Sequence, residues 1–149
     1  MTLQDLYRTV ILDHYRSPRN KGNIENPDLH AVGKNPSCGD ELEVFIKLDP
    51  AGRVEDVKWN GEGCAICCAS SSIMTEFLNK KSKEEIYSLS NKVKNLIKGN
   101  FLKDEEKEDL GELVVLEGVS KFPVRVKCAT LGWVSIEIAF QGKQEASTE

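Results

Sequence analysis

Five cysteines carry most of the chemistry that this sequence offers: Cys38, Cys64, Cys67, Cys68 and Cys128. An odd number of thiols does not pair completely into disulfides. The N-terminal residues have neither the basic start nor the apolar stretch of a signal peptide. Both features predict a cytoplasmic protein with reduced thiols. Reduced thiols either pack as small hydrophobic side chains or act as ligands and nucleophiles.

The surroundings of two cysteines favour chemistry over packing. Cys38 is followed by Gly39 and Asp40, and the glycine permits a tight backbone on which both side chains point to one centre. Cys64 stands at the expected start of a helix, where the helix dipole favours a thiolate. Two expected strands separate the two cysteines, and an antiparallel hairpin brings its ends together. Cys38, Asp40 and Cys64 are therefore predicted neighbours, and Cys128 can complete the set.

Three thiolates and one carboxylate make a tetrahedral zinc site. The same thiolates suit an iron–sulfur cluster. An aspartate is a weaker ligand for such a cluster than a fourth cysteine, and a weaker ligand suits a cluster that is transferred to another protein. Cys64 and Cys67 also form a C-x-x-C pair, the pattern of thiol oxidoreductases. Cys67 and Cys68 are expected to pack as small hydrophobic residues of the helix, and His14 as a buried, hydrogen-bonded side chain.

Length and composition limit the alternatives. The chain has 149 residues, enough for one domain, and 40% hydrophobic residues can form a core. Its 20 basic and 24 acidic residues give a net charge of −4. Nucleic-acid-binding domains are usually strongly basic, so no nucleic-acid partner is expected. No apolar run is long enough to span a membrane, and no membrane partner is expected for the protein.

Hydrophobic spacing predicts most of the elements that position these residues. The expected elements are a helix over 3–15 capped by Thr2, strands over 41–49 and 53–60, and helices over 64–79 and 82–98. Residues 17–37 show almost no periodicity and predict a long irregular loop. The charge run at 103–109 predicts a solvated link. Residues 134–140 alternate as in a strand, but they also fit a helical stripe that begins at about residue 124, and the pattern fits both.

Four ordered stretches resemble a known family. They are residues 13–20, 35–40, 61–72 and 122–129, with the sequences DHYRSPRN, NPSCGD, GEGCAICCASSS and FPVRVKCA. Together they resemble the NifU/IscU/SufU-type iron–sulfur cluster assembly proteins over about residues 3–140. The resemblance implies an α+β fold in which a small antiparallel sheet packs against helices. It also implies a helix over 124–140 and a single domain over 1–140. The polar residues 141–149 are expected to form a flexible tail.

The resemblance further implies the roles of the site residues. Cys38, Cys64 and Cys128 would bind a transient iron–sulfur cluster, [2Fe-2S] by expectation, and together with Asp40 they would hold zinc. Cys38 would accept sulfur from a cysteine desulfurase, and apo-proteins or a downstream scaffold would receive the cluster or the sulfur. Lys127, where IscU-type members carry histidine, and an insertion over about 95–119 resemble the SufU branch.

Four functions follow from these observations. The first is an assembly factor that accepts sulfur and builds or relays a transient cluster. The second is a zinc-dependent sulfur acceptor that delivers persulfide sulfur to a separate scaffold. A structural zinc module for protein interaction and a C-x-x-C oxidoreductase stand outside that class. The sequence leaves open the working occupant of the site, the roles of Cys67 and Cys68, the identity of the desulfurase and the oligomeric state.

Overall fold

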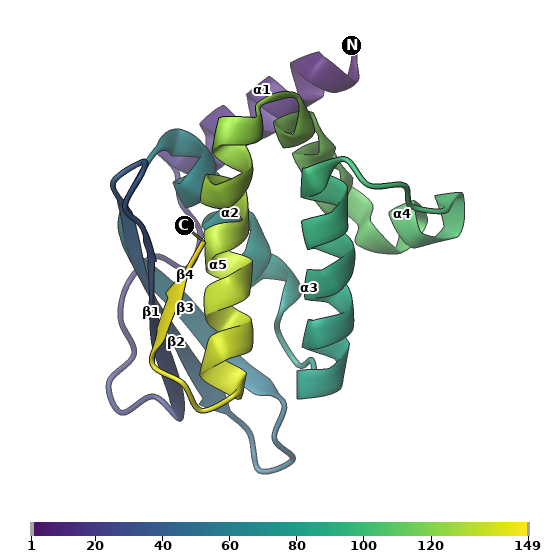
Figure 1. Cartoon of the computed structure of the whole chain (residues 1–149). Coiled ribbons are helices and arrows are strands. Elements are labelled where there is room, and N and C mark those ends of the chain that lie inside the picture. Colours follow the sequence, from purple (N-terminus) through teal and green to yellow (C-terminus); the bar gives the residue numbers. More distant parts are fainter. Residues whose placement is uncertain (1, 149) are drawn as a thin grey trace.

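A four-stranded sheet and a layer of helices on one of its faces make up the molecule (Figure 1). The computed structural model describes residues 2–148. In chain order the elements are α1 (Leu3–Arg16), β1 (Leu29–Asn35), β2 (Asp40–Leu48), β3 (Val54–Glu62), α2 (Ala65–Phe77), α3 (Lys83–Lys98), α4 (Asp104–Leu110), the 3₁₀ helix η1 (Gly111–Lys121), α5 (Pro123–Phe140) and β4 (Glu145–Ser147). The expected α+β class is confirmed.

The sheet has the strand order β3-β2-β1-β4. Strands β1, β2 and β3 are antiparallel neighbours, and the expected hairpin of β2 and β3 is confirmed. The short strand β4 pairs with β1 in parallel, so the sheet is mixed where a purely antiparallel one was expected. This strand lies in the polar C-terminal segment, whose composition gives no strand signal.

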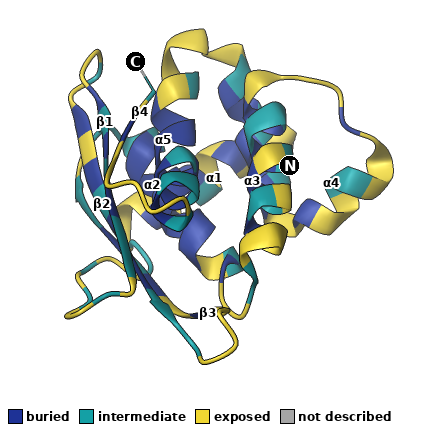
Figure 2. Cartoon of the chain, turned by 60° about the horizontal axis from the view of Figure 1, so that its bottom comes forward, coloured by how far each residue is buried: buried dark blue, intermediate teal, exposed yellow. Residues whose placement is uncertain are grey.

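The helices predicted over 3–15 and 82–98 form where expected. Thr2 and Ser82 both make capping boxes, in which the side-chain oxygen accepts a backbone N–H three residues on. Helix α3 ends at Gly99, whose φ of 82° is the left-handed conformation that favours glycine at a helix end. The alternating segment 134–140 is helical and forms the end of α5. Figure 2 shows α5 largely buried between the sheet and the other helices, so apolar residues occur on several of its sides.

Strand β1 overturns the prediction that residues 17–37 form one irregular loop. Its buried positions are Ala31, Gly33 and Asn35, which give no hydrophobic alternation. They are small or polar because β1 lies against α5. A Cβ at Gly33 would collide with the hydroxyl oxygen of Ser135. Close packing of strand on helix has therefore removed the pattern by which a strand is recognised.

The charge run at 103–109 is also more ordered than predicted. It forms most of α4, which begins with three acidic residues at the end of the helix where the dipole favours negative charge. Only Leu110 of this helix is buried, and Figure 1 shows α4 at the edge of the helical layer, away from the sheet. Within residues 2–148, no helix combines the length and the apolar character needed to cross a bilayer.

Candidate metal centre

The turn between β1 and β2 carries the first two candidate ligands. Asn35 ends β1, Asp40 begins β2, and the two residues pair directly across the strands. The Cys38 N–H donates to the carbonyl of Asn35 over 3.2 Å, and Gly39 has a φ of 72°. The left-handed glycine turns the chain sharply, as the sequence predicts. Cys38 is consequently half-buried on the turn, whereas Asp40 is buried beside it.

The N-terminus of α2 carries the third candidate ligand. Cys64 is the N-cap residue of this helix, two residues after the end of β3. Its backbone N–H donates to Asp40 Oδ1 over 2.9 Å, and its Sγ accepts the N–H of Cys67 over 3.5 Å. A Cβ at Gly63 would lie 2.7 Å from the same Asp40 oxygen. Glycine at that position lets the helix N-terminus approach the carboxylate.

Cys128 reaches this group from the first turns of α5 and is fully buried. Its Sγ, the Cys38 Sγ and a carboxylate oxygen of Asp40 all lie within 4.8 Å of one another. Cys64 is outside that closest trio but contacts both Asp40 and the Cys128 thiol. The structure thus brings together residues from β2, its preceding turn, α2 and α5.

The surroundings of Cys128 oppose a free thiolate at this residue in the absence of a cation. Burial raises the pKa of the Cys128 thiol, and hydrogen bonds with Asp40, Cys38 and Cys64 raise it further. Arg125 lies at the exposed edge of the group. A hydrogen bond with Cys128 raises the pKa of its guanidinium, and the charges of Cys64 and Cys38 raise that pKa further. Sequence reasoning missed Arg125 as a neighbour of the thiols.

The donor set fits a zinc ion. Sulfur and carboxylate oxygen are both zinc ligands, and two sulfurs across a tetrahedral zinc are about 3.8 Å apart. Atoms that already lie within 4.8 Å of one another need only a small movement to reach that spacing. The half-buried Cys38 lies where one ligand can be approached from solvent.

The two further cysteines of α2 pack as expected. Cys67 and Cys68 are both buried, and burial raises the pKa of each thiol. The Cys68 thiol also donates to the carbonyl of Gly63 over 3.6 Å. The run Ser70–Ser72 of the same helix is buried as well.

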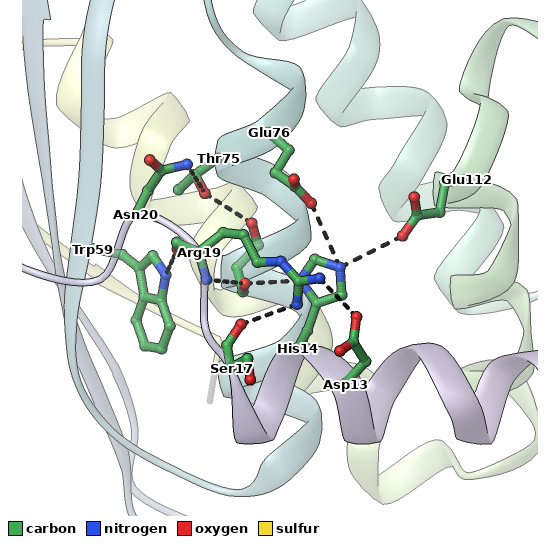
Figure 3. A network of polar contacts seen from close by, with 10 residues as sticks. Asp13, His14, Ser17, Arg19, Asn20, Trp59, Thr75, Glu76 and Glu112 are labelled. Atoms are coloured by element: carbon green, nitrogen blue, oxygen red, sulfur yellow. Dashed lines mark hydrogen bonds and ion pairs between the residues drawn. The ribbon is translucent and has the colours of Figure 1, made fainter.

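A second polar cluster surrounds His14, at the other end of α2 (Figure 3). The Arg19 N–H donates to Ser72 Oγ over 2.8 Å, and Ser72 Oγ lies 2.8 Å from His14 Nδ1. Nδ1 is thereby bonded to the serine, and the other ring nitrogen, Nε2, faces the acidic side chains. That nitrogen lies 3.5 Å from carboxylate oxygens of both Glu76 and Glu112. The prediction that His14 is buried and hydrogen-bonded is confirmed.

Comparison with known proteins agrees with this geometry. The model of the NifU-like N-terminal domain family matches residues 6–129. The chain belongs to the NifU/IscU/SufU family. Among curated relatives of this family, the zinc-dependent sulfurtransferase SufU of Bacillus subtilis is 45% identical over 135 residues, which are 91% of this chain and 89% of the relative.

Two other family members extend the comparison. The iron–sulfur cluster assembly scaffold protein IscU of Streptococcus pyogenes is 35% identical, over 97% of this chain and 88% of its own. A crystal structure of a putative iron–sulfur cluster assembly scaffold protein for the SUF system, from Fervidobacterium islandicum, superimposes with a TM-score of 0.82 at 34% identity. It covers 91% of this chain and 97% of its own.

Proposed function

We propose that this family member accepts sulfur on Cys38 and relays it for iron–sulfur cluster assembly, from a site in which Cys38, Asp40, Cys64 and Cys128 hold zinc. The observation that carries the proposal is the convergence of Cys38, Asp40 and Cys128, with ligand atoms within 4.8 Å of one another. The 45% identity to a zinc-dependent sulfurtransferase supports it independently.

Cys38 is the acceptor because of its position. It is half-buried on a turn, whereas Cys128 is fully buried within α5. Its thiolate attacks the terminal sulfur of a persulfide donor, the sulfur–sulfur bond of the donor breaks, and the donor leaves as a thiolate. Cys38 then carries the persulfide. Zinc bound at the site would lower the pKa of its thiol ligands, so that they are thiolates at neutral pH.

The partner is a cysteine desulfurase, which supplies the persulfide, and the receiving proteins are apo-proteins or a separate scaffold. We place the protein in the cytoplasm, because all five cysteines are free in the structure and reduced thiols persist in that compartment.

Assembly of the cluster on the protein itself is the second candidate function. The relatives named as cluster assembly scaffolds favour it, and so does Asp40, an oxygen ligand that holds iron less firmly than a thiolate. In this reading a [2Fe-2S] cluster is the cargo, bound by Cys38, Cys64 and Cys128.

One anaerobic incubation separates the two functions. The purified protein is first analysed for zinc, for which we expect about one ion per chain. It is then mixed with a cysteine desulfurase and cysteine, with and without ferrous iron. Sulfur on Cys38 with zinc retained supports relay, whereas a visible cluster spectrum with zinc lost supports assembly. Failure to bind zinc and to accept sulfur would contradict both.

A further inference from the structure

Asn35 contacts three of the four candidate ligands. It is the first residue of the motif NPSCGD, in which roles have so far been given only to Cys38 and Asp40. It is the last residue of β1 and is fully buried. Its backbone carbonyl accepts the N–H of Cys38 over 3.2 Å. Its side-chain Nδ2 donates to Asp40 Oδ2 over 3.3 Å and to Cys128 Sγ over 3.5 Å.

The chemistry of the amide suits these two acceptors. Nδ2 carries two protons, and each has one acceptor, so the donor capacity of the group is filled. A carboxylate and a thiolate are both anions, and hydrogen bonds to charged acceptors are the stronger ones. A neutral donor can orient both groups without competing with a metal ion. A lysine or arginine, which carries a positive charge, would compete with it.

The other half of the amide lacks a partner. Oδ1 of Asn35 is a buried side-chain oxygen without a hydrogen-bond partner within the described residues. An unsatisfied buried acceptor destabilises a fold, so a residue chosen for packing alone would be apolar here. The turn itself is closed by the backbone bond from Cys38 and by strand pairing, neither of which requires an amide side chain.

We propose that Asn35 is a positioning residue of the metal centre, whose amide fixes the Asp40 carboxylate and the Cys128 thiolate in the arrangement that receives zinc. This inference rests on the zinc site of the proposed function. Asp40 is then held from two sides, since Cys64 donates to its Oδ1 and Asn35 to its Oδ2. Such outer partners of ligands commonly set metal affinity.

The test replaces Asn35 by leucine, which has nearly the same shape and removes both the donor and the unsatisfied acceptor. Asn35→Ala is the second variant, in case leucine does not fit. The matched control is Asn60→Leu, because Asn60 is also a strand residue whose Nδ2 donates to a side chain, here Asn23, outside the metal centre. Zinc alone is titrated against a competing chelator, and cobalt alone gives an absorption spectrum that reports thiolate coordination.

We expect Asn35→Leu to bind zinc roughly 10- to 100-fold more weakly than the wild type, with a changed cobalt spectrum. The melting temperature of its metal-free form should be unchanged or higher, which a merely structural role does not predict. Wild-type affinity and spectrum in both Asn35 variants would overturn the inference, whatever the melting temperatures. Absence of zinc and cobalt binding in the wild type would instead overturn the proposed site itself.

Discussion

Helix α2 takes part in two polar clusters that balance their charges differently. At its N-terminus, Cys64 joins Cys38, Asp40 and Cys128, a group in which every ionised side chain is an anion. Near its C-terminus, Glu76 faces His14, whose ring also bonds to Ser72 and approaches Glu112. There Arg19 lies 2.7 Å from Asp13, so cation and anion are paired within the cluster.

The difference shows what each cluster requires. The His14 cluster supplies its own donors, acceptors and opposite charges, and it connects α1, α2 and η1 without help. The thiol cluster receives hydrogen bonds from the side chain of Asn35, from the backbone N–H of Cys64 and from Arg125 at its edge. Among those donors Arg125 alone is a cation, so the proposed zinc would supply the positive charge that three thiolates and a carboxylate need.

The largest expected effect concerns which cysteine of α2 belongs to the thiol cluster. Cys64→Ser should weaken zinc binding by more than the roughly 100-fold typical of losing an outer partner, because it removes a ligand. Cys67→Ser and Cys68→Ser should keep about one zinc per chain. Elemental analysis after gel filtration measures all three. Equal zinc loss in Cys64→Ser and Cys67→Ser would instead indicate a C-x-x-C ligand pair.

Removing the centre of the other cluster should affect folding and leave metal binding intact. His14→Ala breaks the bond to Ser72 and leaves a cavity, so the free energy of unfolding should fall by about 2–4 kcal/mol. Denaturant titration measures it, with His30→Ala as control. The half-exposed His30–Glu43 pair should contribute less than about 1 kcal/mol. A loss of zinc in His14→Ala would show that the two clusters are not independent.

A smaller change is expected when the oxygen ligand of the thiol cluster is removed. In Asp40→Ala a reconstituted cluster should last longer in air and pass more slowly to an apo-ferredoxin. The three thiolates dominate affinity, while the exchangeable ligand and its negative charge are gone. Visible absorbance follows both decay and transfer. Faster decay than in the wild type would make Asp40 an ordinary structural ligand.

The smallest effect should come from the exposed pair of the His14 cluster. The hydrogen bond from Arg19 holds the pKa of Asp13 below its ordinary value of 3.8. A carboxyl whose pKa falls on folding stabilises the protein above its unfolded pKa, and this contribution is lost as the pH falls through the folded pKa. The wild type should therefore exceed Asp13→Asn slightly in stability at neutral pH, and the difference should vanish in acid. A difference that persists in strong acid would contradict this assignment.

Local sequence could predict those parts of the fold and site that depend on neighbours in the chain. The N-cap at Thr2 and the hairpin of β2 and β3 could both be predicted from local sequence, and the hairpin alone predicted that Cys38 lies near Cys64. The helical state of 124–140 could not be predicted in this way, because alternating and helical patterns coincide in a helix buried on several sides. Family resemblance resolved that ambiguity.

Contacts between distant segments account for what the sequence did not indicate. Strand β1 was not predicted because its packing against α5 requires Gly33, and Asn35 was therefore assigned to the irregular loop over 17–37. Its contact with Cys128, 93 positions away, exists only once α5 has packed on the sheet. Similarly, Glu112 reaches His14 only through the fold of η1.

The location of transferred sulfur tests the account most directly. The zinc-loaded protein is incubated anaerobically with a cysteine desulfurase and cysteine, alkylated, digested and analysed by mass spectrometry. We expect one additional sulfur atom on the peptide that contains Cys38, no sulfur transfer to the Cys38→Ser variant, and unmodified Cys67 and Cys68. Sulfur on Cys67 or Cys68, or undiminished transfer to Cys38→Ser, would contradict the claim that Cys38 is the acceptor in this metal centre.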